Sequence, residues 1–559
     1  MPTPNMPPRP AATLILARDT PSGLEVYLMQ RTYQAVFLPG FFVFPGGAVD
    51  PVDASDAMLS LCGGLDDAQA SRTLGMERGG LAYVIAAIRE SFEEAGLLLA
   101  HDHRGDYVDI AEPGDVAFYA GLRERLVSGQ LTLADVLRAR GLSAAVERLA
   151  YLSRWVTPVG PPRRFDTRFF VAAAPERQTA VPDGREAVDH IWIAPAEALE
   201  RSRCGELALS SPTLRTLKEL AAFETTDALI KQARRPRRVR PTQPRLASGR
   251  DGKKLFYEGD APYAEIGKVD PQGAGTAAYE ILPGSAVRLS KSVLRLTAPN
   301  PSVMTGPGTN TYLIGNQEVA VIDPGPAIEA HVDAIVAAAP GSIRWILTTH
   351  THLDHSPAAS LLQVKTGAEV LGRPAPEHGG QDRDFRPDRL LRHGDRLAVD
   401  GVTLKAIHTP GHASNHLCFV LEEEKLLFSG DHIMQGSTVV INPPDGDMGA
   451  YVASLKALHE EEMDYIAPAH GFLIDSPYRE LDRLIAHRTA REDKVVTAMR
   501  ELGPASEGEL VALVYDEVPA IMHPLAKRSL LAHLLKLQED GAATNEVGQW
   551  RLAKAKLPR

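Results

Sequence analysis

The feature that most constrains this 559-residue chain is a run of metal-binding residue types within residues 349–356. The run, THTHLDHS, directly follows the apolar segment IRWILT, which predicts a strand that ends at the cluster. His350 and His352 are alternate residues and can point the same way, while Asp354 and His355 can turn toward a neighbouring position. We therefore expect a fold in which strand ends bring metal ligands together.

Three more residues of the same kind follow apolar, strand-like segments further along the chain. They are His412 in TPGHASNH, Asp431 in FSGDH and His470 in APAHG. Five imidazoles and two carboxylates without a thiolate favour Zn²⁺, with Mn²⁺ or Fe²⁺ as chemical alternatives. Seven ligands exceed the needs of one tetrahedral ion and suit two. One ion could take His350, His352 and His412, and the other Asp354, His355 and His470, with Asp431 bridging them.

A pair of ions in such a site performs a definite kind of chemistry. Two metals roughly 3.5–4 Å apart hold a hydroxide at neutral pH and stabilise the oxyanion that forms when it attacks. The sequence therefore predicts hydrolysis of an ester, thioester, amide or phosphodiester. Asp354 is counted as a catalytic residue as well as a ligand, and we expect an Asp354→Ala protein to be inactive.

At these residues the segment of about 290–480 resembles the metallo-β-lactamase superfamily, whose HxHxDH signature stands here at His350 to His355. GPGTNTYLIG, VIDPGP, TPGHASNH, FSGDHIM and HRTARE together resemble the lactamase-β-like endoribonucleases of organelles and their bacterial relatives. The resemblance implies an αββα sandwich, the same seven ligands, and either single-stranded RNA or a thioester as substrate. It does not imply antibiotic hydrolysis.

Residues 481–559 predict a winged helix. Ser506 and Glu509 form a capping box, a longer helix is expected from about Leu525 to Gln538, and ATNEVGQWRLA predicts a hairpin. This block carries twelve Lys or Arg and eleven Asp or Glu. Because phosphate contacts dominate nucleic-acid binding, this near-neutral balance is weak support for an RNA-binding arm.

A second candidate site lies near the N-terminus, where Glu90, Glu93 and Glu94 follow Arg89 in a helical pattern. Carboxylates spaced i, i+3 and i+4 share one helix face. Oxygen ligands alone suit Mg²⁺ or Mn²⁺ bound together with a substrate phosphate. The alternative is an acidic stripe on an ordinary, solvated helix.

FPGG at residues 44–47 followed by RESFEEAG resembles the Nudix hydrolases, and residues 10–225 resemble their coenzyme A-type organellar subgroup. The resemblance implies an α/β/α sandwich, metal binding by Glu90, Glu93 and Glu94, and catalysis by Glu93 and Glu94. It also implies that Arg89 orients these carboxylates, that Gly47 shapes the turn, and that water attacks a diphosphate in a coenzyme A or nucleotide derivative.

This segment departs from the Nudix pattern at two points and leaves one question open. A long insertion separates Gly47 from Arg89, so the first glutamate of the box has no clear equivalent, and Ser91 replaces an aliphatic residue. Arg163, Arg164 and Arg168 could hold a phosphate. Equally, they could be surface or core-edge charges paired with Asp166.

The length fits three or four domains at about 150 residues each. We predict a multidomain α/β and α+β chain with a Nudix domain at 1–225, a basic, proline-containing linker at 226–285, a metallo-β-lactamase domain at 286–480 and a winged helix at 481–559. Residues 231–254 hold ten Lys or Arg against one Asp. They predict a solvated linker or a tail lying over the first domain, the alternative being an arm that contacts RNA or another anion.

Composition narrows the choice of function. Hydrophobic residues make up 44% and charged residues 23%, and the net charge is -11, which excludes wholesale disorder and a chain that coats nucleic acid. Three cysteines without a CxxC pair indicate a reducing compartment. The N-terminus does not resemble a signal peptide, and no apolar run reaches 18 to 20 residues. We expect a cytoplasmic protein with no membrane partner.

Three functions remain open. The chain could be a two-headed hydrolase of small molecules such as acyl-coenzyme A. It could process single-stranded RNA, guided by the winged helix and the basic segment. Or its Nudix block could be a non-catalytic module attached to a working metallohydrolase. The sequence does not predict an oligomeric state.

Overall fold

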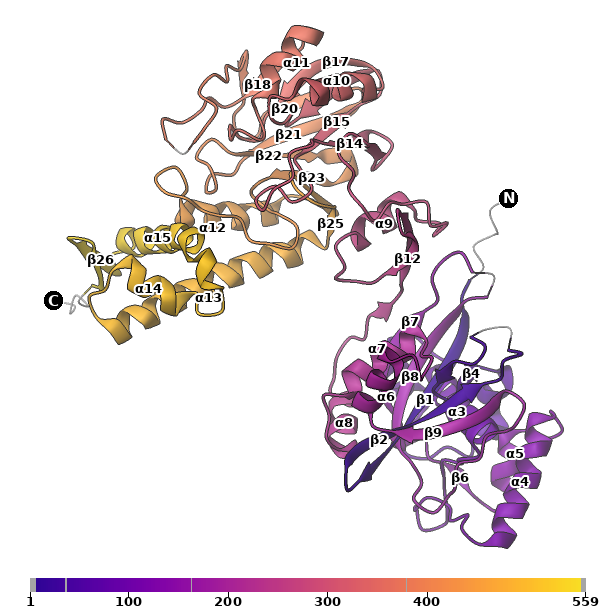
Figure 1. The fold of residues 1–559 in the computed structure, drawn as a ribbon. Helices are drawn as coiled ribbons and strands as arrows, with labels where there is room; N and C mark the ends of the chain where they lie inside the picture. Colours follow the sequence, from indigo (N-terminus) through magenta and orange to yellow (C-terminus); the bar gives the residue numbers. More distant parts are fainter. Residues whose placement is uncertain (1–6, 36–37, 162, 379, 554–559) are drawn as a thin grey trace. The chain divides into compact units, whose positions relative to one another are not determined.

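The computed structural model describes residues 7–35, 38–161, 163–378 and 380–553. The chain forms two compact units, Met1–Pro244 and Arg245–Arg559, and each is described by itself (Figure 1). Within the described ranges, no helix combines the length and the apolar character needed to cross a membrane.

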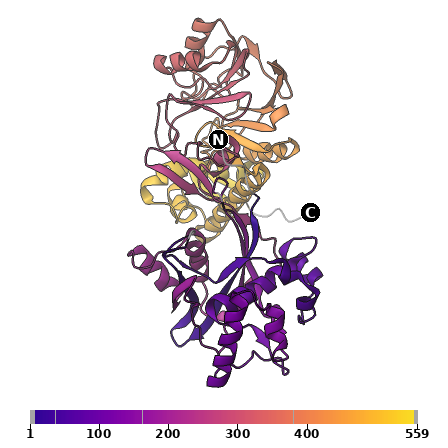
Figure 2. The ribbon, with the colours of Figure 1, turned by 90° about the vertical axis from the view of Figure 1, so that its right-hand side faces the viewer.

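The first unit is built on a mixed eight-stranded sheet in the order β10-β7-β8-β1-β2-β3, with β4 paired to β1 and β9 paired to β2 (Figures 1 and 2). The predicted hairpin across Pro21 to Gly23 forms, since Thr20 pairs with Gly23 between β1 and β2. The strands are β1 (Arg9–Thr20), β2 (Gly23–Arg31), β3 (Phe42–Val43), β4 (Gly46–Ala48), β7 (Ala150–Val156), β8 (Phe165–Ala173), β9 (Ala187–Ile193) and β10 (Pro241–Thr242).

Helices cover both sides of this sheet, because alternate residues of a strand point to opposite faces. Leu14 and Leu16 of β1 belong to one core cluster with Val84 and Ile88 of α3 (Gly80–Glu90), and Ile15 is fully buried on the other face. Figure 1 shows α6 (Pro195–Arg203), α7 (Ser211–Leu220) and α8 (Thr226–Ala233) grouped away from α3. The predicted α/β/α sandwich is confirmed.

The segment 226–285, which the sequence predicts as a linker, contains several regular elements. They are α8, β10, the hairpin β11 (Arg245–Gly249) with β12 (Gly252–Phe256), and α9 (Tyr263–Val269). Some of the basic residues help to hold this segment in place. Arg237 donates hydrogen bonds to the carbonyls of Tyr151 and Leu152 on β7, and Arg234 donates to the carbonyl of Glu147. These guanidinium groups hold backbone of the first unit, while both residues remain exposed.

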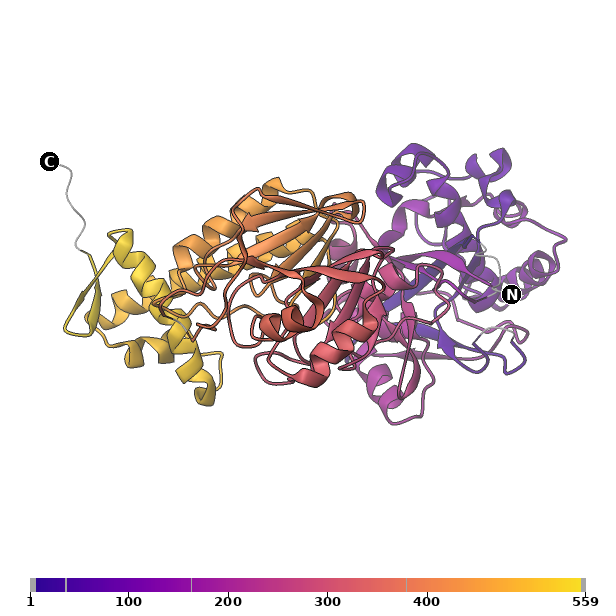
Figure 3. The ribbon, with the colours of Figure 1, turned by 90° about the horizontal axis from the view of Figure 1, so that it is seen from above.

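The second unit contains two sheets packed face to face. One core cluster lies between them and includes Tyr312, Leu404 and Phe428. Separate clusters bury the outer faces against α10 and α11 on the first sheet and α12 and α13 on the second (Figures 1 and 3). The four helices are α10 (Glu329–Ala338), α11 (Ala358–Thr366), α12 (Met448–Ala457) and α13 (Pro477–Leu502). The layers therefore follow the predicted αββα order.

In each of the two sheets, the strands lie side by side in the order in which they occur along the chain. The seven-stranded sheet runs from β13 to β19 and the six-stranded sheet from β20 to β25, both in chain order. Their strands are β13 (Ala286–Arg288), β14 (Val293–Thr297), β15 (Asn310–Ile314), β16 (Glu318–Ile322), β17 (Ser342–Leu347), β18 (Glu369–Gly372), β19 (Arg389–Leu390), β20 (Arg396–Val399), β21 (Val402–His408), β22 (Leu417–Leu421), β23 (Leu426–Gly430), β24 (Tyr465–Pro468) and β25 (Ile474–Asp475).

The C-terminal elements follow the predicted winged-helix order. They are α14 (Glu507–Val514), α15 (His523–Glu539), β26 (Ala543–Glu546) and β27 (Gln549–Leu552), and the Ser506–Glu509 capping box is present. The predicted boundary at 480/481 falls inside α13. Leu481 and Leu484 pack in the core beneath α12, whereas Val495 and Met499 pack with Trp550 in the winged helix. One continuous helix thus belongs to both cores.

Candidate metal centres

The structure brings together all seven residues that the sequence predicts as ligands in the second unit. They fall into two groups, and within each group the ligand atoms all lie within 4.8 Å of one another. The first group is His350, His352 and His412, and the second is Asp354, His355, Asp431 and His470. His350 follows β17, His412 follows β21, Asp431 follows β23 and His470 follows β24. The strand ends therefore meet, as expected from the position of each residue after an apolar run.

The first group consists of three imidazoles in mutual contact. Nδ1 of His352 lies 2.8 Å from Nε2 of His350 and 3.0 Å from Nε2 of His412. Burial lowers the pKa of His352 to about 3 and the pKa of His350 well below its ordinary value, with further lowering from neighbouring histidines. Both rings are thus held neutral, which is the state that ligates a metal.

The second group combines histidines with carboxylates. Oδ1 of Asp431 lies 3.2 Å from Nε2 of His470 and 3.6 Å from Nε2 of His355, while its Oδ2 lies 3.7 Å from Nε2 of His412. Asp431 therefore lies between the two groups. Burial opposes the charged form of His470, but Asp431 and Asp354 raise its pKa to about 9. The two carboxylates of this group therefore stabilise a positive charge beside them.

Unsatisfied atoms show that these residues suit a cation. Nε2 of His355, Nε2 of His470 and Oδ1 of Asp431 are buried and have no hydrogen-bond partner within the described residues. Buried polar atoms normally find partners, and several unpartnered atoms that converge on one point fit a bound cation. Imidazole nitrogens and carboxylate oxygens are also the donors that divalent transition metals accept.

Asp323 is a positioning residue that the sequence reasoning missed. Its Oδ2 lies 2.9 Å from Nδ1 of His355, and its two oxygens accept hydrogen bonds from the backbone N–H and the hydroxyl of Thr349 at 2.7 and 2.8 Å. It directly follows β16 and has a φ of 50°. Its place in VIDPGP, after a strand like the ligands themselves, was the available signal.

Two further ring nitrogens of the cluster lie against backbone carbonyls. Nδ1 of His412 lies 2.8 Å from the carbonyl oxygen of Val440, and Nδ1 of His470 lies 3.2 Å from that of Gly308. Such outer partners fix the ring orientation of a ligand. His416 and His432 are fully buried beside the site, and the ring of His432 packs on Tyr451.

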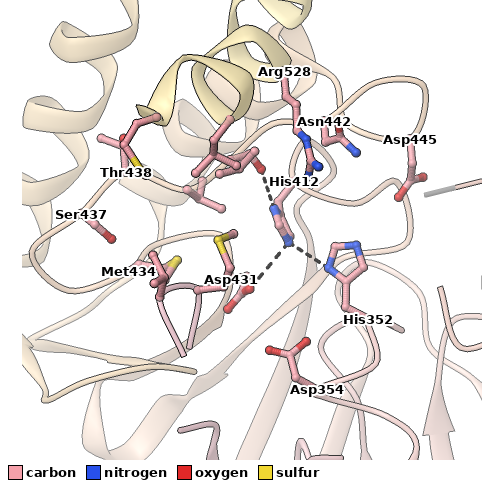
Figure 4. Close-up of a pocket in the computed structure, with 16 residues that line it drawn as sticks. His352, Asp354, His412, Asp431, Met434, Ser437, Thr438, Asn442, Asp445 and Arg528 are labelled. Carbon is pink, nitrogen blue, oxygen red and sulfur yellow. Dashed lines mark hydrogen bonds and ion pairs between the residues drawn. The ribbon is translucent and has the colours of Figure 1, made fainter. Parts of the chain in front are cut away.

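A cavity of about 360 Å³ opens on this cluster (Figure 4). His352, Asp354, His412 and Asp431 lie on its wall, and the side chain of Asp354 is 28% exposed. Much of the remaining wall is apolar and includes Met304, Met434, Val439, Met522 and Leu525. The two ligand groups therefore face a space that a small organic molecule can enter.

The candidate site of the first unit lies where α3 continues into a π-helical turn, Ser91–Ala95. Glu94 accepts a 2.7 Å hydrogen bond from the backbone N–H of Gly46. A Cβ atom placed on Gly47 would lie 2.3 Å from Oε1 of Glu90. The FPGG turn and the acidic helix are thus in contact, and a side chain at position 47 would have to displace the Glu90 carboxylate.

Arg89 organises the acidic residues, as the resemblance implies. Its Nη1 donates to Glu90 at 2.8 Å and to Glu93 at 3.0 Å. Its Nε and Nη2 donate to Asp53 at 2.9 and 3.1 Å. Asp53 is the second residue that the sequence reasoning missed. It occurs six positions after Gly47, but the insertion that follows it conceals its relation to Arg89.

The three glutamates do not form a compact ligand cluster of the kind seen in the second unit. Among the described residues, the two groups above are the clusters of three or more ligand atoms within 4.8 Å. Glu93 turns toward Arg89, whereas Glu94 turns toward Gly46. Burial raises the pKa of Glu90 to about 7 and that of Glu94 well above its ordinary value, and the two charges also oppose each other.

The structure favours the structural alternative for two of the three arginines downstream. Arg168 is buried against the ring of Tyr83 at 4.3 Å and lies 3.2 Å from Asp166. Nε of Arg164 donates to the carbonyls of Thr157 and Pro158. Arg163 is exposed.

The fold and its sites define a metal-dependent hydrolase joined to a Nudix domain. Family models match in the order NUDT19 Nudix domain at 66–220, metallo-beta-lactamase superfamily at 304–470 and beta-lactamase associated winged helix domain at 506–550. The chain belongs to the metallo-beta-lactamase superfamily. This fold implies that a divalent metal is bound, and the two hydrolase domains imply small-molecule substrates.

Curated relatives match just under half of the chain. An atrochrysone carboxyl ACP thioesterase of Aspergillus chevalieri is 33% identical over 268 residues, which cover 45% of this chain and 83% of the relative. A beta-lactamase-like protein 2 homolog of Caenorhabditis elegans is 32% identical, over 46% of this chain and 88% of the relative.

Two solved structures each cover part of the chain. A NUDIX hydrolase from Alicyclobacillus acidocaldarius is 32% identical, with 40% of this chain and 96% of that chain covered and a TM-score of 0.34. A metallo-beta-lactamase family protein from Thermus thermophilus is 22% identical, with 47% of this chain and 100% of that chain covered and a TM-score of 0.41.

Proposed function

We propose that the second unit is a thioester hydrolase with two Zn²⁺ ions, Mn²⁺ or Fe²⁺ being the chemical alternatives. His350, His352 and His412 would hold one ion, and Asp354, His355 and His470 the other. Asp431 would contact both, because its two oxygens face different groups. Bound divalent cations supply Lewis acidity and lower the pKa of a nearby water.

Asp354 is the ligand that we propose to act in catalysis as well, by orienting the attacking water. It lies on the cavity wall with a partly exposed side chain, whereas His355 and His470 are buried. Burial raises the pKa of a carboxyl group, but His355 and His470 hold the pKa of Asp354 far below its ordinary value. The carboxylate therefore stays ionised, so it can help to hold a cation and can accept a hydrogen bond from the attacking water.

The wall of the cavity is the observation that carries the choice of a thioester. Met304, Met434, Met522 and Leu525 present apolar surface that suits an acyl group. Proteins that bind single-stranded RNA stack bases on aromatic side chains. Among the described residues, no Phe, Tyr or Trp lines this cavity. The thioesterase among the relatives supports the same chemistry.

Mass spectrometry of the products from a long-chain acyl-coenzyme A, with Zn²⁺ and Mg²⁺ both supplied, tests this proposal. We expect free coenzyme A from the wild-type protein and none from Asp354→Ala. Recovery of intact substrate, together with cleavage of single-stranded RNA by the wild-type protein, would overturn the proposal in favour of an RNA-processing endoribonuclease.

A second activity is proposed for the first unit, where Glu90, Glu93 and Glu94 would bind Mg²⁺ or Mn²⁺ and a diphosphate-linked substrate such as a coenzyme A or nucleotide derivative. The contact of Glu90 with Gly47, and of Glu94 with the N–H of Gly46, favours it. These contacts hold the carboxylates at a glycine turn, where backbone can approach a phosphate closely. Glu93 and Glu94 are the proposed catalytic residues.

The same mass spectrometry experiment tests the second activity. Cleavage of the diphosphate gives adenosine 3′,5′-bisphosphate and a pantetheine phosphate. We expect Glu93→Gln and Glu94→Gln to abolish these products while release of free coenzyme A continues. Absence of the bisphosphate from the wild-type reaction would instead identify the Nudix domain as a regulatory or inactive module.

A further inference from the structure

The winged helix contributes to the wall of the cavity at the metal centre. Met522, Leu525 and Arg528, from the start of α15 and the residue before it, line the same cavity as His352 and His412. Figure 4 shows the side chain of Arg528 extending from α15 toward His412. A domain whose relatives are described only as associated with the hydrolase fold therefore reaches the candidate active site of this chain.

Arg528 is the basic residue on this wall, and its charge is not neutralised by the protein. Within the described ranges, it makes no hydrogen bond and no ion pair. Asp445, the acidic residue among the described lining residues that is not a proposed ligand, is bound to other side chains. Its oxygens accept hydrogen bonds from Ser414 at 2.6 Å and from Gln381 at 2.8 Å.

The adjacent residue provides a natural contrast. Lys527 lies one position earlier on the same helix and forms an ion pair with Glu507 of α14 at 3.2 Å. Lys527 is not one of the described residues that line the cavity. Two neighbouring cations thus have different environments: Lys527 is paired within the winged helix, and Arg528 faces the cavity.

The wall of the cavity also carries exposed apolar side chains. Val303 is 89% exposed and Met304 is 49% exposed, on the loop before β15. Together with Met522 and Leu525 they form an apolar surface beside one unpaired guanidinium group. Such a surface is complementary to a molecule with an apolar part and a negative charge.

We propose that Arg528 binds an anionic group of the substrate, so that the winged helix is a substrate-specificity element of the metal centre. The inference rests on the proposed thioester hydrolysis. It defines the substrate as an acyl thioester that carries a carboxylate on its acyl group or a phosphate on the part of the molecule that supplies the thiol. Arginine suits both groups, because its planar donors match carboxylate and phosphate oxygens.

Three matched thioesters test this inference on the full-length, zinc-loaded protein. Hexanoyl-pantetheine is neutral. Adipoyl-pantetheine adds one carboxylate to the acyl group, and hexanoyl-4′-phosphopantetheine adds one phosphate to the 4′-hydroxyl of the pantetheine part. The quantity measured is the ratio of kcat/KM for each charged thioester to kcat/KM for the neutral one. The wild-type protein is compared with Arg528→Ala and with Lys527→Ala, which removes the same charge one residue away.

We expect Arg528→Ala to lower this ratio about 10- to 100-fold for one of the two charged thioesters, through a higher KM, since a hydrogen bond to a charged group is lost. The affected thioester identifies the anionic group. Lys527→Ala should leave the ratio unchanged. Equal ratios in the wild-type protein and Arg528→Ala, or equal losses in both variants, would overturn the inference while leaving thioester hydrolysis in place.

Failure of the proposed function gives a different result. In that case the wild-type protein would hydrolyse none of the three thioesters, and the inference would fall with it. Cleavage of single-stranded RNA that depended on Arg528 would then assign this residue to phosphate binding on RNA.

Discussion

Arg89 binds Asp53 through two hydrogen bonds, Nε to Oδ1 at 2.9 Å and Nη2 to Oδ2 at 3.1 Å, across 36 residues of the chain. Asp53 is 1% exposed, so this is a buried ion pair. The same guanidinium group also contacts Glu90 and Glu93. The pair therefore fixes the residue that orients the candidate metal ligands, and it does so from the start of the insertion that separates the two halves of the Nudix box.

Removal of Asp53 is expected to loosen the first unit. Asp53→Ala leaves Arg89 buried without its main partner, and breaking a buried ion pair costs about 3 kcal/mol or more. We predict that amides of α3 exchange hydrogen roughly 100-fold faster, measured by mass spectrometry on the full-length protein. Peptides from β21 to β23 in the second unit serve as the internal reference. Unchanged protection of α3 would mean that the pair is not needed to hold Arg89.

Substitution of Gly47 is expected to separate the two candidate activities. In Gly47→Ala the new methyl group would displace the carboxylate of Glu90, because the two would lie 2.3 Å apart. We predict at least a roughly 10-fold loss of diphosphate cleavage, since small displacements of a positioning group are costly. Release of free coenzyme A should not change.

Gly63→Ala is the matched control for Gly47→Ala, because a Cβ atom there meets no atom within 4 Å. It should retain both activities. A Gly47→Ala protein with full diphosphate cleavage would show that the Glu90 carboxylate is not required where the structure places it.

Loss of one proposed ligand is expected to weaken the binding of one of the two metal ions. In Asp354→Ala, competition with a zinc chelator should show one ion held as in the wild-type protein. The other should be held more weakly, by more than the roughly 10- to 100-fold that loss of an outer partner costs. His459→Ala is the control, since His459 pairs with Asp482 away from the cluster. A single zinc in the wild-type protein would contradict the binuclear assignment.

Asp323 is expected to act on metal binding through His355. Asp323→Asn removes the negative charge that faces Nδ1 of His355 at 2.9 Å, while a similar shape remains. We predict a roughly 10- to 100-fold lower affinity for one zinc ion, measured by the same competition, and a reduced rate of thioester hydrolysis. An unchanged affinity with a lower rate would place the role of Asp323 in catalysis and not in ligand orientation.

The sequence anticipated the residues of the second unit's centre well, because each is a metal-binding type placed directly after a strand. Strand alternation and the position of a strand end are local properties that can be read without knowing the fold. The same holds for the capping box at Ser506 and for the helical spacing of Glu90, Glu93 and Glu94. These features fixed the kinds of chemistry that the chain can perform.

Only the tertiary structure decided which distant residues support that chemistry. The pairing of Asp53 with Arg89, the contact of Asp323 with His355, and the approach of Arg528 to the metal centre join segments that no periodic pattern relates. Likewise, α13 crosses the predicted boundary at 480/481, because its two halves are buried in different cores. Such contacts depend on how sheets and helices pack. The residues that lie between the two partners in the sequence therefore do not predict the contact.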